Sequence, residues 1–311
     1  MQITAFQLLI LWLPLSRCRP EMGVIQKTIL LLGHTGKLGS ALCKAMSSDY
    51  LVIGKNSNDF DAANFAQVTE LIYESQPDII INSVAFMGID ACELDPVKAQ
   101  RINTLLPGHL AKLAAKLGIT LVHFSTDAVF NDEKQDFYNE DDATSPLNLY
   151  GITKFGGECL VRSGCENHYV FRVPQLFGKC GKQNQFVEKM LTLIQNGQNK
   201  ISVSADIISS PTYSCDVAEQ VRQMLLHKAP FGTYHLANEG KASLHELMAE
   251  ILSGLKIDVI VEKAYFTDFP AVGRKNICTP LKSLKTKNLR PWREAVTDYC
   301  RSLEQEGLKY G

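Results

Sequence analysis

Tyr150 and Lys154 lie four residues apart, a spacing that places both side chains on one face of a helix. A free phenol titrates near ~10, and a neighbouring ammonium favours the phenolate and lowers the pKa of the phenol toward working pH. The two residues are therefore a candidate general acid and its charged neighbour. Because such pairs are common in helices, the surrounding segments decide whether this one is catalytic.

A third candidate, Thr126, ends the apolar run that begins at Thr120. A run of this kind is typical of a buried parallel strand. A hydroxyl at the carboxyl end of such a strand could hold a carbonyl oxygen beside the phenol. The predicted catalytic set is therefore Thr126, Tyr150 and Lys154.

A glycine-rich turn lies near the start of the chain. The apolar run 28–32 leads directly into Gly33-His-Thr-Gly36-Lys-Leu-Gly39, and a predicted helix covers 37–46. Strand, turn and helix in this order form a phosphate cradle, since the backbone approaches closely and the helix N-terminus carries positive partial charge. The spacing differs from the usual dinucleotide fingerprint. The predicted cofactor contacts in this turn are Gly33, Thr35, Gly36, Lys37, Leu38 and Gly39.

The segments that must position these residues alternate between strand and helix. Predicted strands cover 28–32, 51–54, 78–83, 120–126 and 169–173, and predicted helices cover 62–73 and 91–116, the latter interrupted at Pro96 and Pro107. This alternation predicts an α/β fold with a Rossmann-like, doubly wound parallel sheet. In such a sheet the ligand lies beyond the carboxyl ends of the strands, where Gly33, Asn82 and Thr126 all fall.

The end of the second predicted strand bears on the cofactor. NAD binding favours an acid there, which hydrogen-bonds the ribose 2′-hydroxyl, but the chain reads Lys55-Asn56-Ser-Asn58. A lysine and neutral amides suit a 2′-phosphate, so NADP(H) is favoured over NAD(H), which stays open. Lys55 could instead be a solvated loop charge.

After residue 173 the alternation loosens. The helix that carries Tyr150 is expected to begin at Ser145-Pro146, and further helices are expected at 186–195, 216–227 and 244–252. We therefore expect an NAD(P)-binding domain over 27–173, with returning strands near 200–213 and 232–236. Residues 174–311 should form mainly a small C-terminal substrate-binding lobe, and residues 1–26 an N-terminal extension of uncertain status.

Composition narrows the class of protein. The chain has 311 residues, is 45% hydrophobic and has a net charge of -1 from 32 basic and 33 acidic residues. Neither sign accumulates in a block, which argues against a nucleic-acid or membrane-surface partner and favours a small molecule. The nine cysteines are scattered without a CxxC pair, so thiols in a reducing, cytoplasmic compartment are expected instead of disulfides or zinc. No metal site is predicted.

The apolar segment from Ile3 to Leu15 is short for a membrane span and lacks the basic start and cleavage site of a secretory signal. Three interpretations stay open. The segment could be a non-native or upstream-start extension of a chain beginning near Met22, an accessory helix, or a true signal or anchor.

Several motifs together resemble one family. The glycine turn, Asn82-Ser-Val-Ala85, Ser125-Thr-Asp-Ala-Val-Phe130 and Pro146-Leu-Asn-Leu-Tyr-Gly-Ile-Thr-Lys-Phe-Gly-Gly-Glu158 are similar to the dTDP-4-dehydrorhamnose reductase branch of the extended short-chain dehydrogenase/reductases. The resemblance covers Thr28 to about Leu236. It implies an NADP-dependent reductase of a 4-keto-6-deoxy nucleotide sugar, most like dTDP-4-dehydrorhamnose to dTDP-L-rhamnose, in polysaccharide biosynthesis.

The resemblance also implies roles for individual residues. Tyr150 would protonate the developing alkoxide, Lys154 would lower the phenol pKa and bind the nicotinamide ribose, and Thr126 would orient the sugar oxygen. Asn103 would support the lysine through water, unless it is a polar residue on an exposed helix face. Asp61 would accept from the adenine amino group, unless it is a surface aspartate. Further implied cofactor contacts are Asn82 and Ala85, and implied substrate contacts are Phe186, Pro211 and Thr212, with plain packing as their alternative.

The chain departs from the family pattern on the substrate side. Gln175 stands where a tryptophan is usual, Ser209 stands where glycine is usual, and the segment 274–281 matches its signature only loosely. Small pocket changes are worth only a few kcal/mol of discrimination. The identity of the sugar, a role for a divalent ion and a homodimer are therefore left open.

Two other functions remain in view. An epimerase or dehydratase of the same superfamily would use the same tyrosine and lysine, although Asp127-Ala128 does not supply the adjacent acid pair expected of a dehydratase. The regulatory subunit of methionine adenosyltransferase resembles the same branch and binds NADP as a partner protein. Such a subunit has no need of the full Thr126, Tyr150 and Lys154 set.

Overall fold

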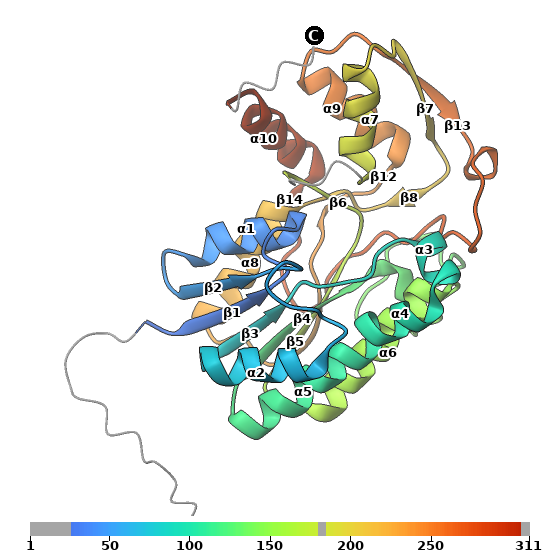
Figure 1. The fold of residues 1–311 in the computed structure, drawn as a ribbon. Helices are drawn as coiled ribbons and strands as arrows, with labels where there is room; N and C mark the ends of the chain where they lie inside the picture. The colour runs from blue at the N-terminus through green and yellow to red at the C-terminus, as the bar shows by residue number, and fades with distance from the viewer. Residues whose placement is uncertain (1–25, 180–184, 306–311) are drawn as a thin grey trace, which may run out of the picture.

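A six-stranded parallel sheet forms the centre of the first lobe in the computed structural model, which describes residues 26–179 and 185–305 (Figure 1). The strand order is β10-β5-β4-β3-β1-β2. The strands are β1 (Thr28–Leu32), β2 (Leu51–Lys55), β3 (Ile79–Asn82), β4 (Thr120–Thr126), β5 (His168–Val173) and β10 (Gly232–His235). The predicted Rossmann-like, doubly wound α/β fold is confirmed.

Helices cover both faces of the sheet (Figure 1). One face packs on α1 (Lys37–Met46) and α8 (Ser214–Leu226), and the other on α2 (Phe65–Ser75), α5 (Leu106–Leu117) and α6 (Leu149–Gly164). Because both faces are covered, the strands are nearly all apolar, as the fully buried run Ile29–Leu32 illustrates. The apolar runs in the sequence are therefore the sheet core.

The second lobe lies over the carboxyl ends of the strands (Figure 1). Its core is formed by α7 (Phe186–Gln195), α9 (Leu244–Gly254) and α10 (Trp292–Gln305) together with short strands. Four two-stranded pairings complete it, namely β6 (Leu176–Phe177) with β9 (Thr212–Tyr213), β7 (Lys200–Ser204) with β13 (Ile260–Ala264), β8 (Ile208–Ser209) with β12 (Ala242–Ser243), and β11 (Asn238–Glu239) with β14 (Leu289–Pro291).

The two segments expected to return to the first lobe behave differently. The segment near 232–236 gives β10, which pairs with β5 at the edge of the main sheet. The segment 200–213 gives β7, β8 and β9, and each of these pairs within the second lobe, so the expectation for this segment was wrong. The apolar pattern of β7 indicates a strand but does not indicate which partner strand it meets.

The helix break expected at Pro107 does not occur. The stretch between β3 and β4 contains α3 (Ile89–Leu94), α4 (Pro96–Gln100), the wide π-turn η1 (Arg101–Leu105) and α5. Pro107 lies in the first turn of α5 and has no N–H to donate to the carbonyl of Asn103. The chain accommodates this with a wider turn, in which Leu106 N–H donates to Arg101 O. The proline therefore widens the helix without ending it.

The start of α6 was predicted three residues too early, at Ser145-Pro146. The helix begins at Leu149, and its N-cap is Asn148, whose side-chain oxygen accepts from Gly151 N–H at 2.9 Å. Asparagine is among the strongest N-cap residues. Two single-turn 3₁₀ helices, η2 (Asp127–Val129) and η3 (Phe266–Asp268), complete the described elements.

Candidate active site

Thr126 and Tyr150 meet at the carboxyl end of the sheet. Thr126 is the last residue of β4 and Tyr150 lies in the first turn of α6, and their side chains are close enough to interact. Burial raises the pKa of Tyr150 above its ordinary value, the interaction with Thr126 lowers it in part, and the carboxylate of Asp127 raises it further. The predicted net lowering of the phenol pKa toward working pH was wrong for this structure, because burial dominates. A raised phenol pKa keeps the proton on the acid.

Lys154 is buried one helical turn after Tyr150, with 3% of its surface exposed. Its Nζ donates to the backbone carbonyl of Phe124 on β4 at 2.5 Å. Burial lowers the pKa of Lys154 to about 8, while Glu158 and Cys92 act in the opposite direction. The ammonium is therefore held against the strand that carries Thr126.

Two close backbone approaches set the position of α6. A Cβ on Gly151 would lie 2.2 Å from Ala128 O in η2, and a Cβ on Gly157 would lie 2.3 Å from Asn103 O in the π-turn. Only glycine permits such distances. The glycines around Tyr150 are therefore required for packing, whatever the chemical role of the motif.

Asn103 lies in the π-turn and is buried. Its amide oxygen accepts from Phe86 N–H at 2.9 Å, and its Nδ2 donates to Phe86 O at 2.9 Å and to Thr153 Oγ1 at 3.2 Å. The described bonds therefore fix the loop after β3 and the residue before Lys154. The alternative of an exposed helix face does not apply, since Asn103 is 1% exposed.

Asp127 is a residue of this site that the sequence analysis left without a role. Its Oδ1 accepts from Thr126 Oγ1 at 3.0 Å, and its Oδ2 accepts from Ser209 Oγ at 3.1 Å and Thr279 Oγ1 at 2.9 Å. Burial raises the pKa of Asp127, and these three hydroxyls counteract it. Ser209 and Thr279 come from two of the segments that depart from the family pattern, so the second lobe is bonded directly to Asp127, next to the end of the strand that carries Thr126.

The segment 274–281, which differs from the family signature, also contacts the start of α6. Asn148 Nδ2 donates to Arg274 O at 2.9 Å and to Asn276 Oδ1 at 2.8 Å. On the opposite side, Glu93 Oε1 accepts from Leu149 N–H at 2.9 Å. The N-cap that orients the turn of Tyr150 is thus itself fixed by α3 and by the chain near residue 275.

The glycine turn fits a dinucleotide pyrophosphate. A Cβ on Gly39 would lie 2.1 Å from Gly33 O, so helix and strand need glycine at that position to pack together. A Cβ on Gly36 would meet only Gly33 O, at 3.4 Å, so packing alone does not require glycine there. Gly36 is also the N-cap of α1, and no side chain caps that helix end. Positive partial charge and open space for an anion coincide at Gly36.

The other predicted cofactor contacts are distributed along the same edge. Lys55 ends β2 half-buried, and its carbonyl accepts from Gly33 N–H at 2.7 Å. Asp61 is exposed, and its Oδ1 accepts from Ala63 N–H at 2.9 Å. Asn82 is buried at the end of β3, where its Nδ2 contacts His123 Nδ1 at 3.2 Å. Ala85 is half-buried in the loop that follows.

The three predicted substrate contacts lie in the second lobe. Phe186 is half-buried at the start of α7 and packs against the core of that lobe. Pro211 is buried. Thr212 is 0% exposed, donates to Ser210 O at 2.9 Å and accepts from Asn238 N–H at 3.1 Å. The packing alternative therefore describes Thr212, because its hydroxyl is already bonded within the protein.

Arg172, near the end of β5, forms a buried ion pair with α6. Its guanidinium donates to Glu158 Oε1 at 3.0 Å and to Glu158 Oε2 at 2.8 Å, and both residues are buried. The pair joins β5 to α6 one turn after Lys154. Its Nη1 also lies 3.4 Å from Nε2 of His235 on β10.

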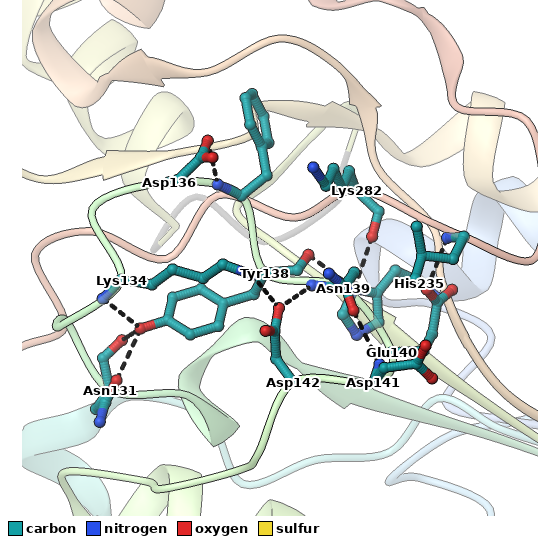
Figure 2. Close-up of polar contacts among 12 residues, drawn as sticks. Asn131, Lys134, Asp136, Tyr138, Asn139, Glu140, Asp141, Asp142, His235 and Lys282 are labelled. Atoms are coloured by element: carbon teal, nitrogen blue, oxygen red, sulfur yellow. Dashed lines mark hydrogen bonds and ion pairs between the residues drawn. The ribbon is translucent and has the colours of Figure 1, made fainter.

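The loop 131–142 is hydrogen-bonded to His235 at the end of β10 and to the segment around Lys282 (Figure 2). His235 Nδ1 lies 3.0 Å from Lys282 O and 3.2 Å from Tyr138 O, and His235 N–H donates to Glu140 Oε1 at 2.9 Å. Burial lowers the pKa of His235 to about 4, so the ring is neutral at physiological pH. These contacts hold the acidic loop that separates Thr126 from α6.

Within residues 26–179 and 185–305, no cluster of three or more histidine, cysteine, aspartate or glutamate side chains could hold a metal ion. In the same ranges no helix is long and apolar enough to cross a membrane. The seven cysteines of these ranges are free thiols.

Comparison with known proteins places this site in context. The family described as RmlD substrate binding domain matches residues 27–305. The chain is 33% identical to the spore coat polysaccharide biosynthesis protein SpsK of Bacillus subtilis over 278 residues, 87% of this chain and 96% of that protein. It is 34% identical to the dTDP-4-dehydrorhamnose reductase of Salmonella typhimurium over 229 residues, 71% of this chain and 76% of that protein.

A solved structure shows the same arrangement. The dTDP-4-dehydrorhamnose reductase of Bacillus anthracis, in complex with NADP, superposes with a TM-score of 0.84 at 28% sequence identity. The match covers 89% of this chain and 100% of the Bacillus anthracis chain. The likeness therefore extends over both lobes.

Proposed function

This chain belongs to the RmlD substrate binding domain family, and from that membership we propose that it reduces a 4-keto-6-deoxy nucleotide sugar with NADP(H). The family makes it an NAD(P)-dependent oxidoreductase. The substrate we propose is dTDP-4-dehydrorhamnose, with dTDP-L-rhamnose as product, for polysaccharide biosynthesis. The observation that carries the proposal is the juxtaposition of Thr126 and Tyr150 on the sheet edge that also carries the open glycine turn.

The chemistry divides between the cofactor and the residues of this chain. When bound, the nicotinamide cofactor would supply the hydride for the sugar C4. Thr126 orients the keto oxygen, and Tyr150 donates its phenol proton to the oxygen as negative charge develops there. The raised pKa of Tyr150 keeps that proton in place until it is needed. Lys154 would stabilise the phenolate left behind and would hold the nicotinamide ribose.

Gly36 and the first turn of α1 would hold the pyrophosphate, because that helix end has no side-chain cap. Lys55, at the end of β2, would contact the 2′-phosphate that distinguishes NADP(H) from NAD(H). Lys55→Ala should therefore weaken NADPH binding and leave NADH binding nearly unchanged. Equal losses for both cofactors would remove Lys55 from this role.

The test of the function is NADPH consumption, followed by its absorbance, with dTDP-4-dehydrorhamnose and a panel of other 4-keto nucleotide sugars. We expect rapid consumption with dTDP-4-dehydrorhamnose and dTDP-L-rhamnose as the product. A protein that binds NADPH but consumes it with no keto sugar is not a reductase. If it also captures a partner enzyme, the regulatory-subunit alternative replaces the proposal.

A further inference from the structure

Lys37 lies at the junction of the two lobes. It is the first residue of α1, directly after the cap residue Gly36, and is 5% exposed. Its Nζ lies 3.1 Å from Glu188 Oε1 and 3.2 Å from Glu188 Oε2, and it donates to Leu176 O at 3.3 Å. Glu188 lies in the first turn of α7. A residue of the glycine turn is therefore paired with a carboxylate from the second lobe.

The pair is unlike the exposed ion pairs of this protein. The side chains of Lys37 and Glu188 are 4% and 12% exposed, whereas those of Lys200 and Glu262, which also form an ion pair, are 53% and 42% exposed. A buried ion pair loses so much solvation that it contributes little net stability. The stability of the fold therefore does not by itself account for the pair.

The charge of Glu188 matters because of what lies beside it. The uncapped end of α1 attracts anions, and the cationic Lys37 would strengthen that attraction. A carboxylate in contact with Lys37 offsets that positive charge and repels a nearby phosphate. Because Glu188 is on α7, this offset depends on where the second lobe lies.

We propose that Glu188 determines the affinity for the dinucleotide pyrophosphate, by offsetting the charge of Lys37 at the glycine turn and tying that turn to α7. The inference rests on the proposed cofactor site. Phe186, a predicted sugar contact, is the first residue of α7. The ion pair of Lys37 and Glu188 therefore links the glycine turn to the helix that is expected to contact the sugar. Cofactor affinity and the position of the sugar-binding lobe are therefore coupled through one ion pair.

The test is the Kd for NADPH, measured by fluorescence at low and at moderate salt. Glu188→Gln should tighten binding by about three- to tenfold at low salt, and the gain should shrink as salt screens the charges. Lys37→Met should weaken binding by a similar or larger factor. The double variant should differ from the sum of the two single effects, since the residues are in contact. Glu262→Gln removes a carboxylate from the exposed pair and should leave the Kd unchanged.

A second readout separates an electrostatic role from a structural one. Glu188→Gln should raise the KM for the keto sugar while it lowers the Kd for NADPH, because the tie to α7 is lost. General damage to the fold would worsen both constants. If Glu188→Gln does not fold, the exchanged pair Lys37→Glu with Glu188→Lys keeps the contact and places the carboxylate on α1, which should weaken NADPH binding.

An unchanged or weaker Kd in a folded Glu188→Gln protein overturns the inference, and so does unchanged binding in the exchanged pair. Wild-type protein that binds neither NADPH nor NADH would instead overturn the proposed function. The two failures are therefore distinguishable.

Discussion

In the main sheet, three of the five pairs of neighbouring strands are consecutive along the chain and are joined through helices, as β4 and β5 are through α6. In the second lobe the pairings join distant segments, such as β7 with β13 and β8 with β12. The first region carries the candidate acid on locally determined elements. The second region contacts Asp127 and Asn148, which lie beside that acid, through hydrogen bonds from far along the chain. The chemistry should therefore be separable from the lobe by mutation.

Tyr150→Phe should give the largest effect and should leave both regions folded. Loss of one positioned hydroxyl removes the general acid, so turnover should fall by a factor on the order of 10²–10⁴. The Kd for NADPH should change little, because the ring and Lys154 remain. The measurement is turnover with a keto sugar beside NADPH titration. Turnover close to that of wild type would take Tyr150 out of the mechanism.

Glu158→Gln should break the frame of the first region. It leaves Arg172 buried without its carboxylate, and removal of one member of a buried pair costs ~3–5 kcal/mol of unfolding free energy. Chemical denaturation measures the loss. Glu262→Gln, in the exposed pair of the second lobe, is the matched control, and a comparable loss there would erase the contrast between the regions.

Lys154→Met should alter how stability depends on pH. Burial lowers the pKa of Lys154 from 10.5 to about 8, so between these values the unfolded chain holds a proton that the folded protein lacks. The free energy of unfolding therefore rises across that window, by at most ~1.4 kcal/mol per pH unit. The variant lacks this rise, and denaturation at pH values spanning the window compares the two slopes. Parallel slopes in both proteins would mean that Lys154 keeps its ordinary pKa.

Ser209→Ala should give the smallest effect and sharpen the boundary between the regions. It removes one of the two bonds from the second lobe to Asp127, so the loss of unfolding free energy should be about 1 kcal/mol. Thr279→Val is the matched change from the other segment and should cost a similar amount. If both changes cost nothing in thermal or chemical unfolding, Asp127 does not hold the lobe.

The sequence predicts the first region well because its signals are local. The apolar runs of β1 to β5 and the glycine turn each identify an element without knowledge of any distant residue. The sequence-based predictions fail where a neighbouring residue takes the expected role, as Asn148 does when it caps α6 in place of Ser145. At Pro107 a wider turn replaces the expected break.

The second region is less predictable for a different reason. The alternation of Ile201 and Val203 with polar residues indicates a strand at β7, but its pairing with β13 depends on a segment far along the chain. Asp127 shows the same limit within the site. Its three hydroxyl partners come from residues 126, 209 and 279, and no spacing in the sequence relates them.

The two glycines that seat α6 have a consequence for how variants of this protein will be interpreted. Gly157 lies beyond Lys154 along the helix, yet a methyl group there would collide with Asn103 O and displace α6, the helix that carries Tyr150. Gly151 acts in the same way against Ala128 O. A survey of inactive mutants would therefore score both positions as if they took part in the reaction. Both positions are sensitive because of packing. Restoring activity would therefore require a compensating change in the opposing backbone and not a new functional group.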